Sequence, residues 1–342
     1  MFSDIKKPPV SLLKGGRRFV ALRPHFPCGI PPYKAAGWRG VSPLKCWVNG
    51  SVIKSKSQSQ AINRAHMGRH RGIYKPERNE PYELSRGRLE AFINCEACFW
   101  LDRVKGVKFP SIPGFLLNTN TDTLLKKDLD QFRGNGPHPI MSAAGLSQLR
   151  PFSHEDIGRW ESSLHFGSSP NHFNTIHEET NILFGGGIDD IWENVESGEL
   201  HIVDYKSTAQ MGAHPTPLDE TFIAPPEDPI KVDYKAGYRR QMEMYQWILR
   251  RKGFSVSDTG YFLYVDGQHK NEAGMIDPND PSQAWMRFNT AIIPFVGDDS
   301  WVEAALSRAK ITLEKDYCPE HAVNCEHGKF IEQVRSALNF RP

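Results

Sequence analysis

Residues 181–208 have the sequence NILFGGGIDDIWENVESGELHIVDYKST, in which two apolar runs flank the turn sequence VESG. Runs of this kind, separated by a short polar turn, predict a β-hairpin. Leu200, Ile202 and Val203 suit a buried strand, yet Asp204 and Lys206 follow on one face of it. Since burying a charge costs several kcal/mol unless it is paired or bound to a metal, this pair requires an explanation.

The position of the turn brings a second acid to the same place. If the turn centres on residues 196 and 197, Asp189 lies opposite Asp204; if it centres on residues 197 and 198, Asp189 lies opposite Lys206. Both registers place the Cβ atoms of the three residues within about 4.5–8 Å of one another. Two acids and a lysine are therefore expected to converge at the end of the hairpin.

The rest of the chain alternates between helical and extended patterns. An α/β fold follows, with a mixed sheet flanked by helices in an αβα sandwich. The expected helices cover residues 84–107, 121–133, 232–253 and 300–316, and further strands cover residues 259–267 and 284–298.

Charge is distributed unevenly along the 342 residues. Residues 1–66 hold 12 Lys or Arg and one acid, which gives +11, so the remaining 30 bases and 39 acids give −9. Four interpretations of segment 1–66 are open. It is disordered, it is a basic arm that binds nucleic acid, or it is a targeting segment. In the fourth interpretation it is an over-extended reading frame, and the true start is Met67. The last interpretation is favoured over any function for the segment.

The bulk composition excludes several classes of protein. No apolar run reaches the roughly 18 residues of a membrane-spanning helix, and no secretion signal is recognisable. A cytoplasmic location without a disulfide framework is therefore expected.

The converging acids have a chemical interpretation. Mg²⁺ binds through one or two carboxylates together with substrate phosphate and water, and a lysine beside it stabilises developing charge. A plain ion pair at a strand end is the alternative, and a second DYK at residues 233–235 is assigned to that class. Gln241 and Tyr245 share one face of the following helix, where they form either a structural network or part of the site.

Four motifs in order resemble the PD-(D/E)XK nuclease superfamily, in its RecB-like branch. They are LSRGRLEAFINCEACFWLDRVKG at 84–106, GGID at 186–189, VDYKST at 203–208 and QMEMY at 241–245. The resemblance covers about residues 80–335 and implies a restriction-endonuclease-like domain that cleaves DNA with Mg²⁺ or Mn²⁺. It implies metal ligation by Asp189 and Asp204, catalysis by Lys206, and supporting roles for Gln241 and Tyr245. Asp122 stands near the position where many members carry a histidine ligand, so it is a weaker candidate ligand.

The same resemblance bears on the cysteines. Several RecB-like exonucleases join an N-terminal cysteine to a C-terminal cysteine cluster through an iron–sulfur centre, although Gly328 stands where such families often have another cysteine. The candidate ligands for such a cluster or for Zn²⁺ are Cys95, Cys98, Cys318 and Cys325, with His327 as a spare. Buried free thiols are the alternative.

The leading hypothesis is thus a metal-dependent DNA nuclease. A non-catalytic nucleic-acid-binding module, or a structural subunit of a repair or defence complex with partner proteins, is the alternative on the same fold. Strong duplex binders carry an excess of basic residues, whereas the chain after residue 66 has an excess of acids. It indicates a local basic groove, help from a partner or weak binding, and residues 239, 240 and 250–252 form either a basic surface or solvated helix charges.

Overall fold

The computed structural model describes residues 69–110, 114–162, 167–212, 214–228, 230–270 and 272–338. The chain divides into two units, residues 1–62 and 63–342, and every described residue belongs to the second. The expectations for residues 1–66 and for a start at Met67 lie outside the described residues.

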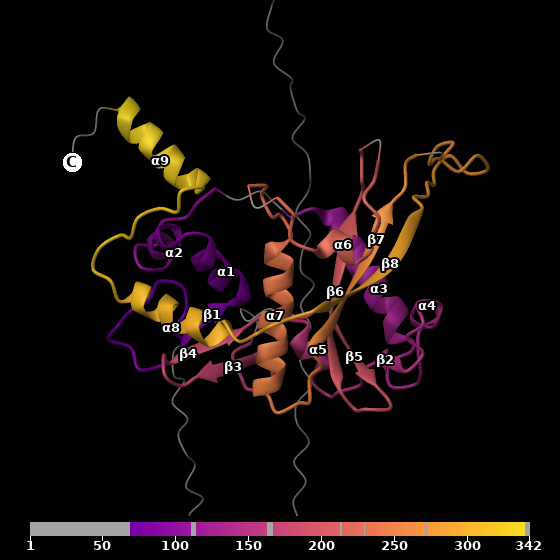
Figure 1. The fold of residues 1–342 in the computed structure, drawn as a ribbon, viewed down its shortest axis with the longest axis horizontal. Coiled ribbons are helices and arrows are strands. Elements are labelled where there is room, and N and C mark those ends of the chain that lie inside the picture. The colour runs from indigo at the N-terminus through magenta and orange to yellow at the C-terminus, as the bar shows by residue number, and fades with distance from the viewer. Residues whose placement is uncertain are drawn as a thin grey trace, which may run out of the picture. The chain divides into compact units, whose positions relative to one another are not determined.

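The strands of this unit form two mixed sheets (Figure 1). In the three-stranded sheet, of order β1-β4-β3, β1 pairs with β4 in parallel and β3 pairs with β4 antiparallel. In the five-stranded sheet, of order β2-β5-β6-β7-β8, only β6 and β7 are parallel. The strands are β1 Tyr82–Ser85, β2 Leu149–Pro151, β3 Asn174–His177, β4 Ile182–Gly185, β5 Asp190–Asn194, β6 Leu200–Thr208, β7 Thr259–Gly267 and β8 Phe288–Val296.

Helices lie against both sheets. Helix α7 contacts β6, β3, α1 and α8, so it adjoins strands of both sheets, whereas α3 contacts β6. The helices are α1 Arg86–Asn94, α2 Glu96–Arg103, α3 Leu116–Asp130, α4 Pro139–Ala143, α5 Ile157–Trp160, α6 Glu220–Ile223, α7 Ala236–Arg251, α8 Val302–Leu313 and α9 Glu326–Ala337.

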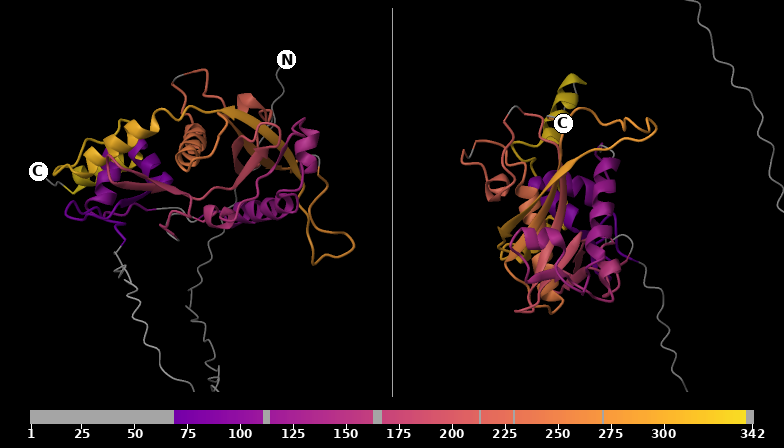
Figure 2. Two further views of the ribbon diagram at one scale, coloured as in Figure 1. Left: turned by 90° about the horizontal axis from the view of Figure 1, so that it is seen from below. Right: turned by 90° about the vertical axis from the view of Figure 1, so that its right-hand side faces the viewer.

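Alternation along β6 and β7 separates two hydrophobic cores. Ile202 and Phe262 belong to a core shared with α7, whereas Val203 and Leu263 belong to a second core shared with α3 and α4. Because successive side chains point to opposite faces, α7 and α3 cover opposite faces of the five-stranded sheet (Figure 2). The predicted α/β sandwich is confirmed, with its strands divided between two sheets.

The predicted helix 84–107 is interrupted. Its first residues form β1, and Cys95 has extended backbone angles of φ −165° and ψ 109°, which separate α1 from α2. This break turns the chain between Asn94 and Glu96, so that α1 and α2 pack against each other. Helix α9 was not predicted, and none of its side chains is buried.

Within the described residues, no helix has both the length and the apolar character needed to cross a membrane.

Candidate functional site

The hairpin of β5 and β6 fixes the register of the predicted acids. Asp190 pairs with Val203, which is the register of a turn centred on residues 196 and 197, and Asp189 directly precedes the first paired residue of β5. The Oδ2 atom of Asp189 accepts a hydrogen bond of 2.8 Å from the backbone N–H of Tyr205. The structure therefore brings Asp189 beside the Asp204–Lys206 segment.

Asp204 is the most buried member of this group, with 1% of its surface exposed. Its Oδ2 atom forms an ion pair with the ammonium of Lys206, and its Oδ1 atom accepts a hydrogen bond of 2.7 Å from Nε2 of Gln241 on α7. The ammonium also lies 4.8 Å from the centre of the Tyr238 ring. Three predicted residues, Asp204, Lys206 and Gln241, are thus in direct contact.

Burial makes this carboxylate hard to ionise. It raises the pKa of Asp204 to about 7; Lys206 opposes this rise, whereas the neighbouring carboxylate of Asp189 adds to it. Carboxyl groups whose pKa lies near neutral pH, and which have a like and an opposite charge beside them, are frequent at functional sites. Two oxygen ligands of this kind fit Mg²⁺ or Mn²⁺ by their chemistry.

Tyr245 lies beside the glycine run that precedes Asp189. A Cβ on Gly186 would lie 3.0 Å from the Tyr245 hydroxyl, so glycine at this position permits the close approach. Burial raises the pKa of Tyr245 to about 12, and the guanidinium of Arg86 at the start of α1 opposes this rise. Tyr245 therefore supports the backbone next to Asp189, and Arg86 is a neighbour that the sequence did not indicate.

Asp122 on α3 is half-buried near the same end of the sheet. Its neighbour Thr121 forms a hydrogen bond with Ser207, the residue after Lys206, which anchors α3 to the end of β6. Burial raises the pKa of Asp122, followed by the charge of Asp189, and Lys126 opposes both from 3.4 Å. The charge of Asp189 thus acts on Asp122, and the role of Asp122 as a weaker metal ligand stays a prediction.

A buried network behind the acids was missed from sequence. Asp190 is fully buried, and its carboxylate accepts hydrogen bonds from the Tyr205 hydroxyl at 2.8 Å, Arg133 at 3.0 Å and Trp192 Nε1 at 3.1 Å. Tyr205 in turn donates its N–H to Asp189, so this network fixes the backbone that holds both acids. The second aspartate of the IDDI sequence was the available signal.

The second DYK sequence has a different environment. Asp233 forms an ion pair with Arg239, and the ammonium of Lys235 lies 3.4 Å from the centre of the Phe222 ring. Among the described residues, no hydrogen bond or ion pair joins Asp233 or Lys235 to Asp204. The same tripeptide therefore serves as a control for the one at 204–206.

The basic residues of α7 are engaged by other groups. Arg240 pairs with Glu90 at 2.6 Å, Arg251 pairs with Glu178 at 2.6 Å, and Lys252 donates to the carbonyl of Pro170 at 2.7 Å. Arg250 pairs with two aspartates, and Arg239 with Asp233. These partners favour charged helix residues with local roles over a nucleic-acid surface at this place.

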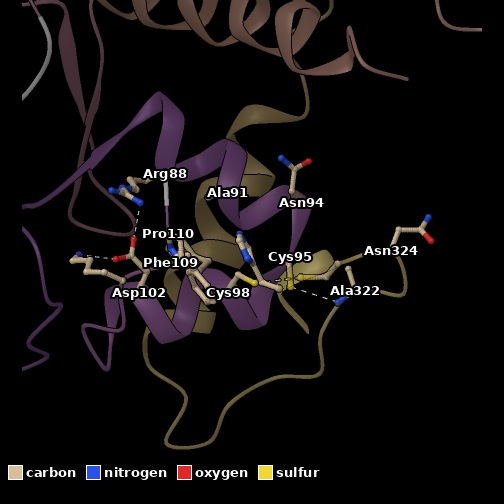
Figure 3. A pocket seen from close by; sticks show the side chains of 14 residues that line it. Arg88, Ala91, Asn94, Cys95, Cys98, Asp102, Phe109, Pro110, Ala322 and Asn324 are labelled. Carbon is tan, nitrogen blue, oxygen red and sulfur yellow. Dashed lines mark hydrogen bonds and ion pairs between the residues drawn. The ribbon is translucent and has the colours of Figure 1, made fainter. Parts of the chain in front are cut away.

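A second group of chemistry-bearing residues joins α1 and α2 to the segment after α8. Cys95, Cys98, His321 and Cys325 bring one ligand atom each to within 4.8 Å of one another, so the four residues can hold a metal ion. Nδ1 of His321 lies 3.5, 3.6 and 3.7 Å from the Sγ atoms of Cys95, Cys98 and Cys325, and the last two Sγ atoms are 3.3 Å apart. Figure 3 shows Cys95 and Cys98 near Ala322, whose N–H lies 3.5 Å from Cys95 Sγ.

This group differs from the predicted one in one member. Cys318 is exposed and lies outside the group, and His321 takes the fourth position. The predicted spare ligand His327 stacks on Phe109 instead, with 4.4 Å between the ring centres. The structure brings His321 rather than Cys318 to the other three ligand atoms, and C-x₂-C followed by H-x₃-C was the signal in the sequence for this choice.

Gly328 has a steric role in the cysteine group. A Cβ at this position would lie 2.6 Å from Cγ of His321, and the Gly328 N–H lies 3.3 Å from Sγ of Cys325. Glycine therefore leaves space for the imidazole and allows a backbone donor to approach the thiol. A cysteine at position 328 would place the same Cβ against the imidazole.

The thiols of the group influence one another. Burial raises the pKa of Cys95, but backbone N–H donors of Cys98 and Ala322 and the imidazole of His321 outweigh it and lower the pKa to about 7. Burial and the neighbouring thiols Cys325 and Cys95 raise the pKa of Cys98. A shared cation would relieve the repulsion among thiolates held this close.

No protein-family model, no curated protein and no solved structure matches this chain, so its chemistry has to be inferred from its own residues and their geometry.

Proposed function

We propose that this chain is a metal-dependent nuclease that hydrolyses phosphodiester bonds of DNA. The observation that carries the proposal is the buried carboxylate of Asp204, held between Lys206 and Gln241, with the Asp189 carboxylate bonded to the backbone N–H of the next residue, Tyr205. The order of the sequence motifs, which resembles that of PD-(D/E)XK nucleases, supports the same reaction.

Each group has a defined part in this proposal. Asp189 and Asp204 would hold Mg²⁺ or Mn²⁺, with Asp122 as a further acid nearby. Such an ion, when bound, would supply neutralisation of phosphate charge and a lower pKa for water. Lys206 orients the attacking water and stabilises charge on the phosphate, Gln241 positions Asp204, and Tyr245 supports the glycine backbone before Asp189.

Cleavage of end-labelled single-stranded and double-stranded DNA in Mg²⁺ or Mn²⁺ tests this function. Asp204→Ala and Lys206→Ala are expected to abolish the products, whereas Lys235→Ala, which changes the lysine of the second DYK, is expected to retain them. Equal activity in all proteins would indicate a contaminant and contradict the proposal. DNA binding without cleavage would favour a non-catalytic module.

We also propose that Cys95, Cys98, His321 and Cys325 bind one zinc ion in a structural role. Tetrahedral zinc, with bonds of about 2.3 Å to sulfur and about 2.0–2.1 Å to nitrogen, separates its ligand atoms by roughly 3.5–3.8 Å. Four of the distances in this group, 3.3–3.7 Å, support such an ion, and all four ligand atoms lie within 4.8 Å of one another. The common iron–sulfur clusters are held by four cysteine thiolates, which this group of three cysteines and one histidine does not match.

A further inference from the structure

A cavity of about 860 Å³ lies beside the cysteine group, between α1, α2 and the segment before α9 (Figure 3). This volume is within the range of about 300–1,000 Å³ that is usual for ligand sites. Figure 3 shows Arg88 and Asp102 toward one end of the cavity and Cys95 and Ala322 toward the other. The residues that bear on its chemistry are Arg88, Asp102, Lys108, Phe109 and His327.

The end that contains Asp102 carries an excess of positive charge. Asp102 is 6% exposed and already forms two hydrogen bonds, of 2.9 and 2.8 Å, with the buried guanidinium of Arg103. Arg88 and Lys108 each add a further bond of 2.7 Å to the same carboxylate. Three cations therefore share one anion.

Two of these cations face solvent. The side chains of Arg88 and Lys108 are 42% and 66% exposed, whereas that of Arg103 is 6% exposed. In the part of the chain that the structure describes, Asp102 is the only carboxylate paired with either Arg88 or Lys108. Arg88 and Lys108 thus present two positive charges to the cavity, while Arg103 already neutralises the Asp102 carboxylate that they share. Two cations with this surplus of positive charge are suited to bind an anion such as phosphate.

An aromatic pair lies in the same cavity. Phe109, next to Lys108 in sequence, stacks on the exposed imidazole of His327 with the ring planes inclined by 26°. Aromatic faces beside a cationic groove are the usual means of holding unpaired bases of a nucleic-acid strand. A phosphate site and a stacking surface are therefore adjacent along the chain.

Helix α1 links this cavity to the candidate nuclease site. Arg86 lies close to the hydroxyl of Tyr245, and Arg88 follows two residues later, a rise of about 3 Å along the helix. The first turn of α1 thus contributes Arg86 to the candidate nuclease site and Arg88 to the cavity.

We propose that this cavity binds single-stranded DNA, with Arg88 and Lys108 on a backbone phosphate and the Phe109–His327 pair against a base. The proposal deepens the proposed nuclease function and rests on DNA as its substrate. Stacking requires an unpaired base, which favours a single strand over a duplex. The excess of nine acids after residue 66 also disfavours a broad duplex-binding surface.

The test is fluorescence anisotropy of labelled oligo(dT), with zinc-loaded protein in an Asp204→Ala background that does not cleave. The double substitution Arg88→Ala and Lys108→Ala is expected to weaken binding about tenfold or more at low salt. It is also expected to reduce the slope of log K against log salt by about 0.7, because the two side chains share one phosphate and each phosphate neutralised on a single strand contributes about 0.7. His327→Ala is expected to weaken binding about tenfold without changing the slope.

A matched control uses Lys105, which lies near Lys108 but outside the cavity lining, over the Trp100 ring. Lys105→Ala is expected to leave affinity nearly unchanged, and unaltered zinc content and thermal unfolding verify that each variant is folded. Equal affinity and slope for the double variant and its parent would overturn the proposal, as would binding of duplex alone.

The failure of this proposal is distinguishable from failure of the nuclease. Suppose that the protein with intact Asp204 cuts no DNA but binds single strands in a way that depends on Arg88 and Lys108. This result would overturn the proposed nuclease function and support the proposed strand site. Metal-dependent cleavage that is equally efficient in the double variant, with unchanged strand affinity, would overturn the cavity and sustain the nuclease.

Discussion

Gln241 on α7 donates a hydrogen bond of 2.7 Å to the Asp204 carboxylate on β6, across 37 residues of sequence. This contact joins the helix and the hairpin at the most buried charge of the candidate nuclease site. The amide orients one oxygen of the carboxylate, while Lys206 neutralises the other. The bond is therefore a direct target for substitution.

Gln241→Ala is expected to lower kcat by at least tenfold and to weaken Mn²⁺ binding. Removing the donor leaves a buried carboxylate oxygen without its amide partner, which costs about 1–3 kcal/mol and lowers Tm by a few degrees. Gln246→Ala is the matched control, since this buried glutamine of the same helix bonds to the carbonyls of Ser257 and Asp258. The control should lose stability and keep its Mn²⁺ affinity; a matching loss of affinity in both would indicate a merely structural role for Gln241.

Mn²⁺ binding at the carboxylates is expected to depend on pH through Asp204. With a pKa of about 7, this acid is protonated at pH 6 and ionised at pH 8, and a ligand must be ionised to bind metal. Affinity should therefore rise about tenfold per pH unit below pH 7 and level off above it, in calorimetric titrations with Mn²⁺. A flat profile between pH 5.5 and 8 would contradict Asp204 as the titrating ligand, and Asp204→Asn should remove the dependence.

Zinc content discriminates among the cysteines. Elemental analysis of the purified protein is expected to give one zinc per chain, and Co²⁺ substitution should give the visible absorption of a tetrahedral thiolate site. Cys98→Ser and His321→Ala should lose the metal, while Cys318→Ser should retain it because Cys318 lies outside the group. Brown protein containing iron and sulfide would instead support the cluster implied by the family resemblance.

Gly328→Ala tests the steric account of the cysteine group. The new methyl group would lie 2.6 Å from the imidazole of His321, so the ring must move away from the three sulfurs. Zinc affinity measured by competition with a chelator should fall by at least tenfold, while Lys329→Ala, on the exposed side of the same helix, should match the parent. Parent-like affinity in Gly328→Ala would show that His321 is not held against Gly328.

The convergence of acids was predictable because it depends on local rules. Alternation within a strand and the two possible positions of one turn place Asp189 opposite either Asp204 or Lys206, and β5 and β6 pair in the register of the first option. Gln241 was placed on the inward face of its helix by its spacing alone, whereas its bond to Asp204 was not predicted and fits both a structural network and a part of the site. Periodicities of two and of 3.6 residues contain this information.

The remaining features depend on contacts between distant segments. A continuous helical pattern covers residues 84–107, yet Cys95 adopts an extended backbone there, which no propensity indicated. The choice of His321 over Cys318 follows from how the segment after α8 folds back onto α2. Arg133 and Asp190 likewise meet across 57 residues, beyond the reach of any local pattern.

The cysteine group also determines how the chain is connected in space. Cys98 and His321 are 223 residues apart in sequence, so an ion bound between them closes most of the described chain into a single ring. Closing a ring of this size restricts the unfolded chain by about 5 kcal/mol if the ion acts as a covalent cross-link would. A protease that cuts once in the exposed segment between β7 and β8 would open this ring without separating its halves, and chelation afterwards would remove the link between them.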